Sequence, residues 1–284
     1  MLSRVPPVWL VVAGIASVQF GAGIAKSLFD DAAPLTLVWL RLATSAVVLA
    51  AVVRPTLHRR TPEDWRVAVA FGVVLGTMNA AIYESFARIP LGIAVTIEFL
   101  GPLGLAVAGS RRARDLVWVA LAAVGVGLLG VERGDLTVAG VAFALLAAVS
   151  WTAYILLSAS TGRRWPGLDG LTVASVVATV MMAPILAAFS GRGITDPRVV
   201  VLGALVGLLS SVIPYSCEIT ALRTIRPSVF GILMSLEPAA AALAGIVVVH
   251  EFLSALQWLA VVCVIAASVG ATRSESRLAA PVPD

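Results

Sequence analysis

Four glutamates lie inside long apolar stretches of this sequence, at Glu84, Glu98, Glu218 and Glu237. A charge at the centre of a bilayer costs about 3 kcal/mol on insertion scales, so such residues face a cavity, form a pair or take up a proton. Desolvation favours the neutral form of a carboxyl group. We therefore predict that these glutamates bind protons or the cationic group of a substrate. The alternative is structural: Glu98 or Glu237 donates to a backbone carbonyl that a nearby proline leaves free.

Other polar and aromatic side chains fall in the same apolar stretches. Arg41 can bind a carboxylate or act as the counter-ion of a glutamate. The alternative is that its side chain extends to the membrane interface, as we expect for Lys26. The remaining side chains predicted to line a polar cavity are Gln19, Asn79, Tyr83, Trp151, Tyr154 and Tyr215. Hydrogen bonding between helices is the alternative for each of them.

Prolines beside two of the glutamates predict interruptions of the helices that carry them. Glu98 is followed by Gly101 and Pro102, and Glu237 is followed by Pro238. Proline has no backbone N–H and breaks or kinks a helix in its interior. The N-terminus of the resumed helix carries a partial positive charge. We therefore expect these breaks to supply donors for an anionic group of a substrate.

The composition is that of a membrane protein. Of 284 residues, 60% are hydrophobic and 13% are charged, whereas a typical soluble domain is roughly 25% charged. A helix needs about 20 apolar residues to cross the hydrocarbon core. The alternating pattern of transmembrane strands is absent, so the predicted fold is all-α with ten transmembrane helices. They are expected at residues 8–28, 33–53, 67–87, 90–110, 115–131, 136–160, 170–190, 199–222, 227–249 and 252–271.

Basic residues in the predicted loops indicate the orientation. If the N-terminus is cytoplasmic, 14 Lys and Arg residues lie on the cytoplasmic side and 5 on the other side. Cytoplasmic loops carry an excess of Lys and Arg. Both termini are therefore predicted to be cytoplasmic, as an even number of helices requires. The five residues on the opposite side are Lys26, Arg88, Arg133, Arg192 and Arg198.

The two halves of the sequence resemble each other weakly. Ile89 and Pro102 recur as Ile225 and Pro238, in each case 136 residues later. Such matches predict a duplicated five-helix unit, and because five is odd the second copy crosses the membrane in the opposite sense. Inverted repeats are typical of secondary transporters, whose substrate site lies near the midplane between the halves. The predicted units are the first repeat 1–134, the second repeat 135–272 and a disordered cytoplasmic tail 273–284.

Several function classes are disfavoured by the sequence. It contains no GxxxxGK nucleotide loop, no nucleophile motif and no His/Asp metal cluster. We therefore expect no cofactor or metal, and a membrane-embedded enzyme or signalling protein is the disfavoured alternative. Basic residues form short clusters between apolar runs, so nucleic-acid binding is not expected. Among transporters, export of drugs or other metabolites remains an alternative, although aromatic residues make up only 7% of the chain.

Four stretches of the sequence resemble a known family. They are AKSLF at 25–29, PLGIAVTIEFLGPL at 90–103, SRRARDLVWV at 110–119, and PYS at 214–216 together with MSLEPA at 234–239. Through them the chain resembles the EamA-type ten-helix class of the drug/metabolite transporter superfamily, and within that class the bacterial threonine/homoserine exporters. The resemblance implies ten helices, cytoplasmic termini, an inner-membrane location, and efflux of small amino acids in exchange for protons by alternating access. It assigns no site residues and leaves the oligomeric state open.

Overall fold

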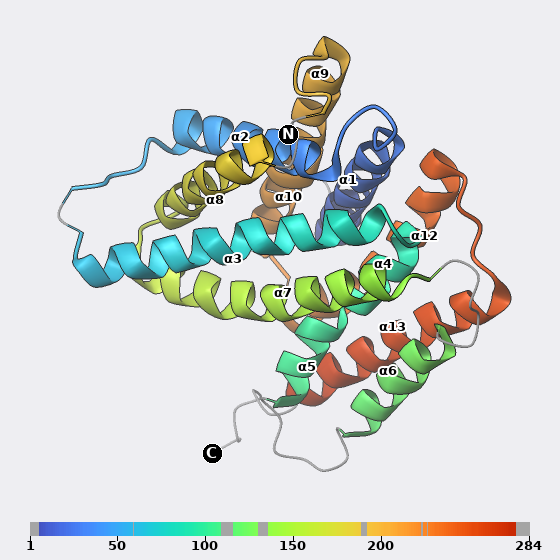
Figure 1. Ribbon diagram of the computed structural model, residues 1–284. Helices are drawn as coiled ribbons and strands as arrows, with labels where there is room; N and C mark the ends of the chain where they lie inside the picture. The colour runs from blue at the N-terminus through green and yellow to red at the C-terminus, as the bar shows by residue number, and fades with distance from the viewer. Residues whose placement is uncertain are drawn as a thin grey trace, which may run out of the picture.

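The computed structural model describes residues 6–58, 60–108, 116–129, 136–188, 192–222, 224–225 and 227–276. These residues form helices and no β-strands (Figure 1). Two π-helical turns, Leu208–Val212 and Gly245–Val249, continue the helices that precede them. The helices are α1 (Pro7–Ser27), α2 (Pro34–Val53), α3 (Pro62–Phe86), α4 (Leu91–Glu98), α5 (Leu100–Ala108), α6 (Leu116–Leu129), α7 (Val138–Arg164), α8 (Asp169–Ala188), α9 (Pro197–Gly207), α10 (Ile213–Leu222), α11 (Pro227–Met234), α12 (Glu237–Ala244) and α13 (Ala255–Ser276).

Local sequence determines where several helices begin. Proline is favoured at the first helical position because its missing N–H would have no partner there. At the start of α3, Thr61 and Asp64 form a capping box, in which each side chain accepts from the backbone N–H of the other. The helices that begin at a proline include α1 at Pro7, α2 at Pro34, α3 at Pro62 and α9 at Pro197.

Eight helices among the described residues are long and apolar enough to cross a membrane. They include the α4–α5 pair, taken as Leu91–Ala108, and the segment Val229–Val249, which contains most of α11 and all of α12. The predicted spans 115–131 and 199–222 correspond to shorter apolar helices, α6 and Pro197–Val212. Residues 109–115 and 130–135, on either side of α6, lie outside the described residues.

Both predicted interruptions are present, but each lies just before its proline. The first break is at Phe99, between α4 and α5, and Pro102 is the third residue of α5. The second break covers Ser235 and Leu236, and Pro238 lies in the first turn of α12. Proline is tolerated in a first turn because no intrahelical partner is lost there. The residues before each proline therefore leave the helix, and the proline itself stays in it.

Two glycines allow the broken α4–α5 pair to pack closely against its neighbours. A Cβ atom at Gly101 would lie 2.1 Å from the backbone oxygen of Ala148 in α7. A Cβ atom at Gly92 would lie 2.7 Å from the Cα atom of Ala242 in α12. Gly101 therefore permits the approach of α5 to α7, in addition to standing beside the helix break.

The packing leaves much of the apolar surface exposed. Figure 1 shows α3 and α7 side by side across the molecule, and α6 paired with α13. Large apolar side chains such as Val138 and Phe252 are 88% and 76% exposed. Monomers in water rarely expose so much apolar surface, so we expect lipid to surround these exposed apolar side chains. At the C-terminal end, α13 continues to Ser276, four residues into the predicted tail, and 277–284 lie outside the described residues.

Candidate functional site

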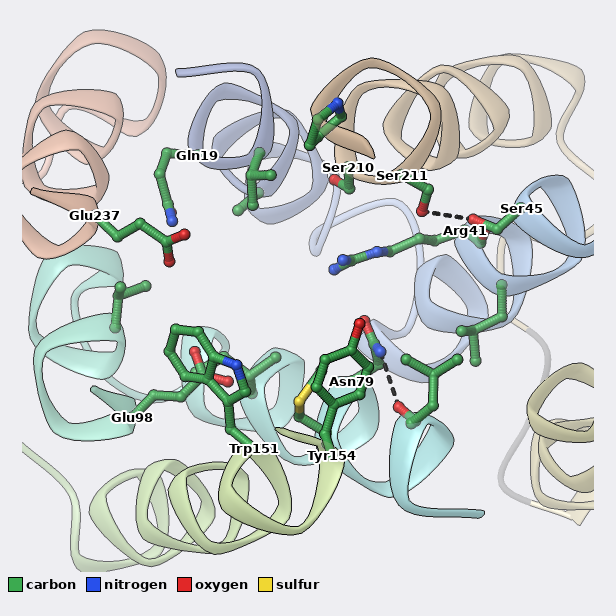
Figure 2. A pocket seen from close by; sticks show the side chains of 18 of the residues that line it. Gln19, Arg41, Ser45, Asn79, Glu98, Trp151, Tyr154, Ser210, Ser211 and Glu237 are labelled. Carbon is green, nitrogen blue, oxygen red and sulfur yellow. Dashed lines mark hydrogen bonds between the residues drawn. The ribbon is translucent and has the colours of Figure 1, made fainter. Parts of the chain in front are cut away.

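A cavity of about 230 Å³ lies among the helices. Its walls come from α1 to α4, α7, α8 and α10 to α12, and therefore from residues on both sides of position 134 (Figure 2). The polar and aromatic residues of the wall are Gln19, Arg41, Ser45, Asn79, Phe86, Glu98, Trp151, Tyr154, Ser175, Ser210, Ser211, Glu218 and Glu237. Eight of the side chains predicted from the sequence thus meet in one space.

Three of the four predicted glutamates face this cavity. Glu98 is the last residue of α4, Glu218 lies in α10, and Glu237 is the first residue of α12. None of the three carboxyl groups forms an ion pair or hydrogen bond within the described part of the chain. Glu237 interacts electrostatically with both Glu98 and Glu218. Like charges repel strongly at low dielectric, so this group of carboxyls is stabilised by binding a proton or a cation.

Arg41 supplies positive charge on the opposite side of the cavity. Figure 2 shows its side chain extending from α2 toward the middle of the space, with Glu237 and Gln19 across from it. Its guanidinium lies 5.7 Å from the centroid of the Tyr83 ring, and it interacts electrostatically with Glu98. No residue within the described ranges forms an ion pair with Arg41. The cavity therefore brings together an arginine and three carboxyl groups that have no ion-pair partner among the described residues.

Neutral polar and aromatic side chains complete the wall. Gln19 is only 3% exposed, and its Oε1 atom has no hydrogen-bond partner among the described residues. The amide nitrogen of Asn79 donates to the backbone carbonyl four residues earlier, at 2.8 Å. Trp151 and Tyr154 line the cavity from α7, and the Trp151 ring packs edge-on against Phe99 at the helix break. The aromatic groups thus connect the α4–α5 break to the cavity.

Two other predicted site residues, Tyr83 and Glu84, do not line the cavity. Tyr83 is fully buried and packs against Phe86, and its hydroxyl has no partner within the described chain. Glu84 points elsewhere and forms an ion pair with Arg88, one turn later in the sequence. The side chain of Tyr215 lies outside the described residues.

Four serines of the cavity wall were not predicted from the sequence. They are Ser45, Ser175, Ser210 and Ser211. A signal for two of them exists in Pro214, which has no N–H to donate to the carbonyl of Ser210. The helix contains a π-turn at this point, Leu208–Val212, in which the N–H of Ile213 donates to the carbonyl of Leu208. Such turns occur frequently at functional sites.

One end of α1 is tied to α4 and to the segment before α13. Lys26 forms an ion pair with Glu251 and donates a 2.8 Å hydrogen bond to the carbonyl of Ile89. The same Glu251 accepts a hydrogen bond from the backbone N–H of Leu91, at 2.9 Å. Lys26 therefore does not extend to the interface as expected. Phe86 lines both the cavity and a second hollow of about 540 Å³ beside this ion pair.

The Lys26–Glu251 pair gives a stability prediction. Glu251→Gln leaves a largely buried ammonium without its counter-charge, and the free energy of unfolding is expected to fall by about 2–4 kcal/mol. The double variant Lys26→Met/Glu251→Gln removes both charges and should be more stable than the single variant. Thermal unfolding of the purified proteins in detergent measures both. A double variant less stable than Glu251→Gln would contradict the assignment of the pair.

Comparison with known proteins identifies the family and supports the fold. Residues 138–273 match the EamA-like transporter family. The threonine/homoserine exporter RhtA of Escherichia coli (strain K12) is 39% identical over 97% of this chain and 96% of its own length. RhtA of Salmonella typhimurium (strain LT2) is 38% identical over 95% of this chain and 94% of its own length. A crystal structure of a protein with 18% identity, covering 95% of this chain and 99% of that chain, has a TM-score of 0.65 and shows a shared fold.

The apolar helices, the family match and the extent of similarity to the exporters lead to one conclusion about class and location. Their agreement does not depend on any single residue of the cavity. The chain is a multi-pass inner-membrane protein, and it belongs to the EamA-like transporter family.

Proposed function

We propose that the protein exports small amino acids of the threonine and homoserine type, in exchange for protons. The observation that carries the proposal is the cavity, which holds an unpaired arginine and three unpaired carboxyl groups among the described residues. A zwitterionic amino acid presents one charge of each sign. Its carboxylate fits Arg41 and its ammonium fits the carboxyls of Glu98 and Glu237. The names of the relatives supply the substrate class.

The proposed topology is ten transmembrane helices in two inverted five-helix repeats, 1–134 and 135–272, with cytoplasmic termini. The broken helices support it. Helices α4 and α11 are each eight residues long and end at Glu98 and Met234. These two positions are 136 residues apart, the same spacing that relates Pro102 to Pro238. In this scheme α6 is the fifth helix, and α9 with α10 forms the eighth.

The proposed mechanism is alternating access. An amino acid enters the cavity from the cytoplasm and binds between Arg41 and the carboxyls. A proton arriving from the outside neutralises one carboxyl, and the ammonium then loses its partner and leaves. Movement of one repeat against the other must open the outer end, where Phe86 lines both the cavity and the second hollow and the Lys26–Glu251 pair lines that hollow.

Export of drugs is a weaker alternative, because clefts that hold drug-sized ligands have volumes of roughly 300–1,000 Å³. The cavity of about 230 Å³ is smaller. The relatives named above are exporters, which also makes an enzyme the less supported class.

The test is uptake of labelled threonine and homoserine into proteoliposomes that contain the purified protein. With a pH gradient imposed, we expect accumulation that unlabelled amino acid competes away and that collapses when an ionophore dissipates the gradient. Liposomes without protein are the control. Gradient-independent equilibration would support amino-acid transport and refute proton coupling. Absence of uptake by folded protein would refute the amino-acid proposal.

A further inference from the structure

We propose that Ser210 binds the side-chain hydroxyl of the substrate and makes the transporter selective for hydroxylated amino acids over their methyl isosteres. This inference rests on the proposed function, because it assigns one part of the same cavity. It identifies a specificity residue that neither the sequence pattern nor the charges of the site indicate.

The first argument is the unsatisfied hydroxyl of Ser210. The residue is 8% exposed, lines the cavity, and its Oγ atom has no hydrogen-bond partner within the described residues. Buried polar groups without a partner are unfavourable and uncommon in proteins. A hydroxyl can both donate and accept, which is what a second hydroxyl requires of its partner. A ligand hydroxyl therefore gives Ser210 a hydrogen-bond partner, either as donor or as acceptor.

The neighbouring serines are already occupied with each other. The Oγ of Ser45 lies 2.7 Å from the Oγ of Ser211 and 2.8 Å from the carbonyl oxygen of Arg41. Since a serine has one hydroxyl hydrogen, Ser45 donates to the carbonyl when Ser211 donates to Ser45. Among Ser45, Ser210 and Ser211, Ser210 is the one whose hydroxyl has no hydrogen-bond partner within the described residues, which makes it the candidate binding group.

The fold fixes the position of Ser210 between α1 and α2. The π-turn is held to α1 by a 2.6 Å hydrogen bond from Ser17 Oγ to the carbonyl of Leu209. On α1, a Cβ atom at Gly21 would lie 2.7 Å from Ser210 Oγ, so only glycine leaves room for the hydroxyl. On the other side, a Cβ atom at Gly207 would lie 3.0 Å from the backbone of α2. The backbone that carries Ser210 is thus packed closely against both α1 and α2.

The location suits the side chain of a short amino acid. Figure 2 shows Ser210 and Ser211 on the wall above the Arg41 side chain, and Glu237 across the cavity from Arg41. A substrate whose carboxylate meets Arg41 directs its ammonium toward the carboxyls, and its third substituent is left near the π-turn. A methyl group placed there leaves Ser210 buried and unpaired, and sites built to bind a hydroxyl reject such analogues strongly.

The experiment compares hydroxylated substrates with methyl isosteres, as competitors of labelled threonine uptake into proteoliposomes. Valine replaces the hydroxyl of threonine by a methyl group, and norvaline does so for homoserine. For the wild-type protein we expect threonine and homoserine to compete about tenfold better than their isosteres, which is the order of one hydrogen bond between neutral groups. In Ser210→Ala the preference should fall to about twofold or less, since only the pairing of one hydroxyl is removed.

Two further variants control this result. Ser268→Ala removes a buried serine whose Oγ lies 2.7 Å from Ser235 Oγ, outside the cavity, and should keep the wild-type preference. Gly21→Ala removes no polar group, but its added methyl group displaces the Ser210 hydroxyl. It should therefore lower the preference for hydroxylated substrates as Ser210→Ala does.

The outcomes separate this inference from the proposed function. If the wild-type protein moves no amino acid of either kind, the proposed function fails. If it moves threonine but does not distinguish it from valine, the proposed function stands and the Ser210 assignment is overturned. An unchanged preference in Ser210→Ala, or in Gly21→Ala where Ser210→Ala does not fold, also overturns it.

Discussion

Replacing Arg41 by glutamine is expected to raise the half-saturating concentration for amino-acid transport by about 10- to 150-fold, since a hydrogen bond to a charged group contributes about 1.5–3 kcal/mol. The reason is that Arg41 is the cationic group of the cavity wall and has no ion-pair partner within the described residues. Its charge is therefore available to a substrate carboxylate. Concentration dependence of labelled threonine uptake measures the effect, with thermal unfolding as the check on folding.

Arg41→Lys separates charge from geometry. Lysine keeps the positive charge but loses the two parallel donors that match a carboxylate, so we expect an intermediate defect of about 5- to 10-fold. The alternative role of Arg41, as counter-ion of Glu98, predicts a different pattern. In that case Arg41→Gln changes the dependence of transport on the pH gradient and leaves the affinity for threonine near its wild-type value, which would refute carboxylate binding.

Replacing Glu98 or Glu237 by glutamine is expected to abolish accumulation driven by the pH gradient, while exchange of labelled for unlabelled amino acid continues. Both carboxyls line the cavity and interact electrostatically, so the uptake of a proton by one is linked to the state of the other. Glutamine preserves shape and can still form hydrogen bonds but cannot carry a proton between the two sides. Parallel measurements of gradient-driven uptake and of exchange separate coupling from binding.

Glu84→Gln is the matched control for these two variants. Glu84 also lies in a membrane-spanning helix, but its carboxylate pairs with Arg88 and does not line the cavity. We expect it to keep gradient-driven uptake. Wild-type accumulation in both Glu98→Gln and Glu237→Gln would remove these residues from the proton pathway and direct attention to Glu218.

The helical class and most of the membrane spans were predictable, because an apolar stretch of about 20 residues has the length that a helix needs to cross the hydrocarbon core. The residues around Pro102 and Pro238 also predicted two interruptions. Their location was less predictable, because a proline is stable in a first turn and displaces the break to the residues before it. The predicted span 115–131 agrees with α6 over residues 116–129, the part of it that the structure describes.

The charged part of the cavity was predictable because an ionisable residue in lipid needs a reason to be there. Arg41, Glu98 and Glu237 stood out for that reason alone. Serines carry no such penalty and are common in transmembrane helices, so Ser210 gave no signal by itself. The Lys26–Glu251 pair was missed because its partners are more than 200 positions apart, and sequence spacing says nothing about such contacts.

The charges of the cavity also have a consequence for biogenesis. Arg41 leaves the ribosome about 200 residues before Glu237, an interval on the order of 10–40 s at about 5–20 residues per second. Throughout that time the bilayer or the insertion machinery must accommodate the helix that carries Arg41 before the carboxyl group of Glu237 has been synthesised. Substitutions at the late carboxyls are therefore expected to lower the amount of protein that survives membrane quality control, independently of any effect on transport.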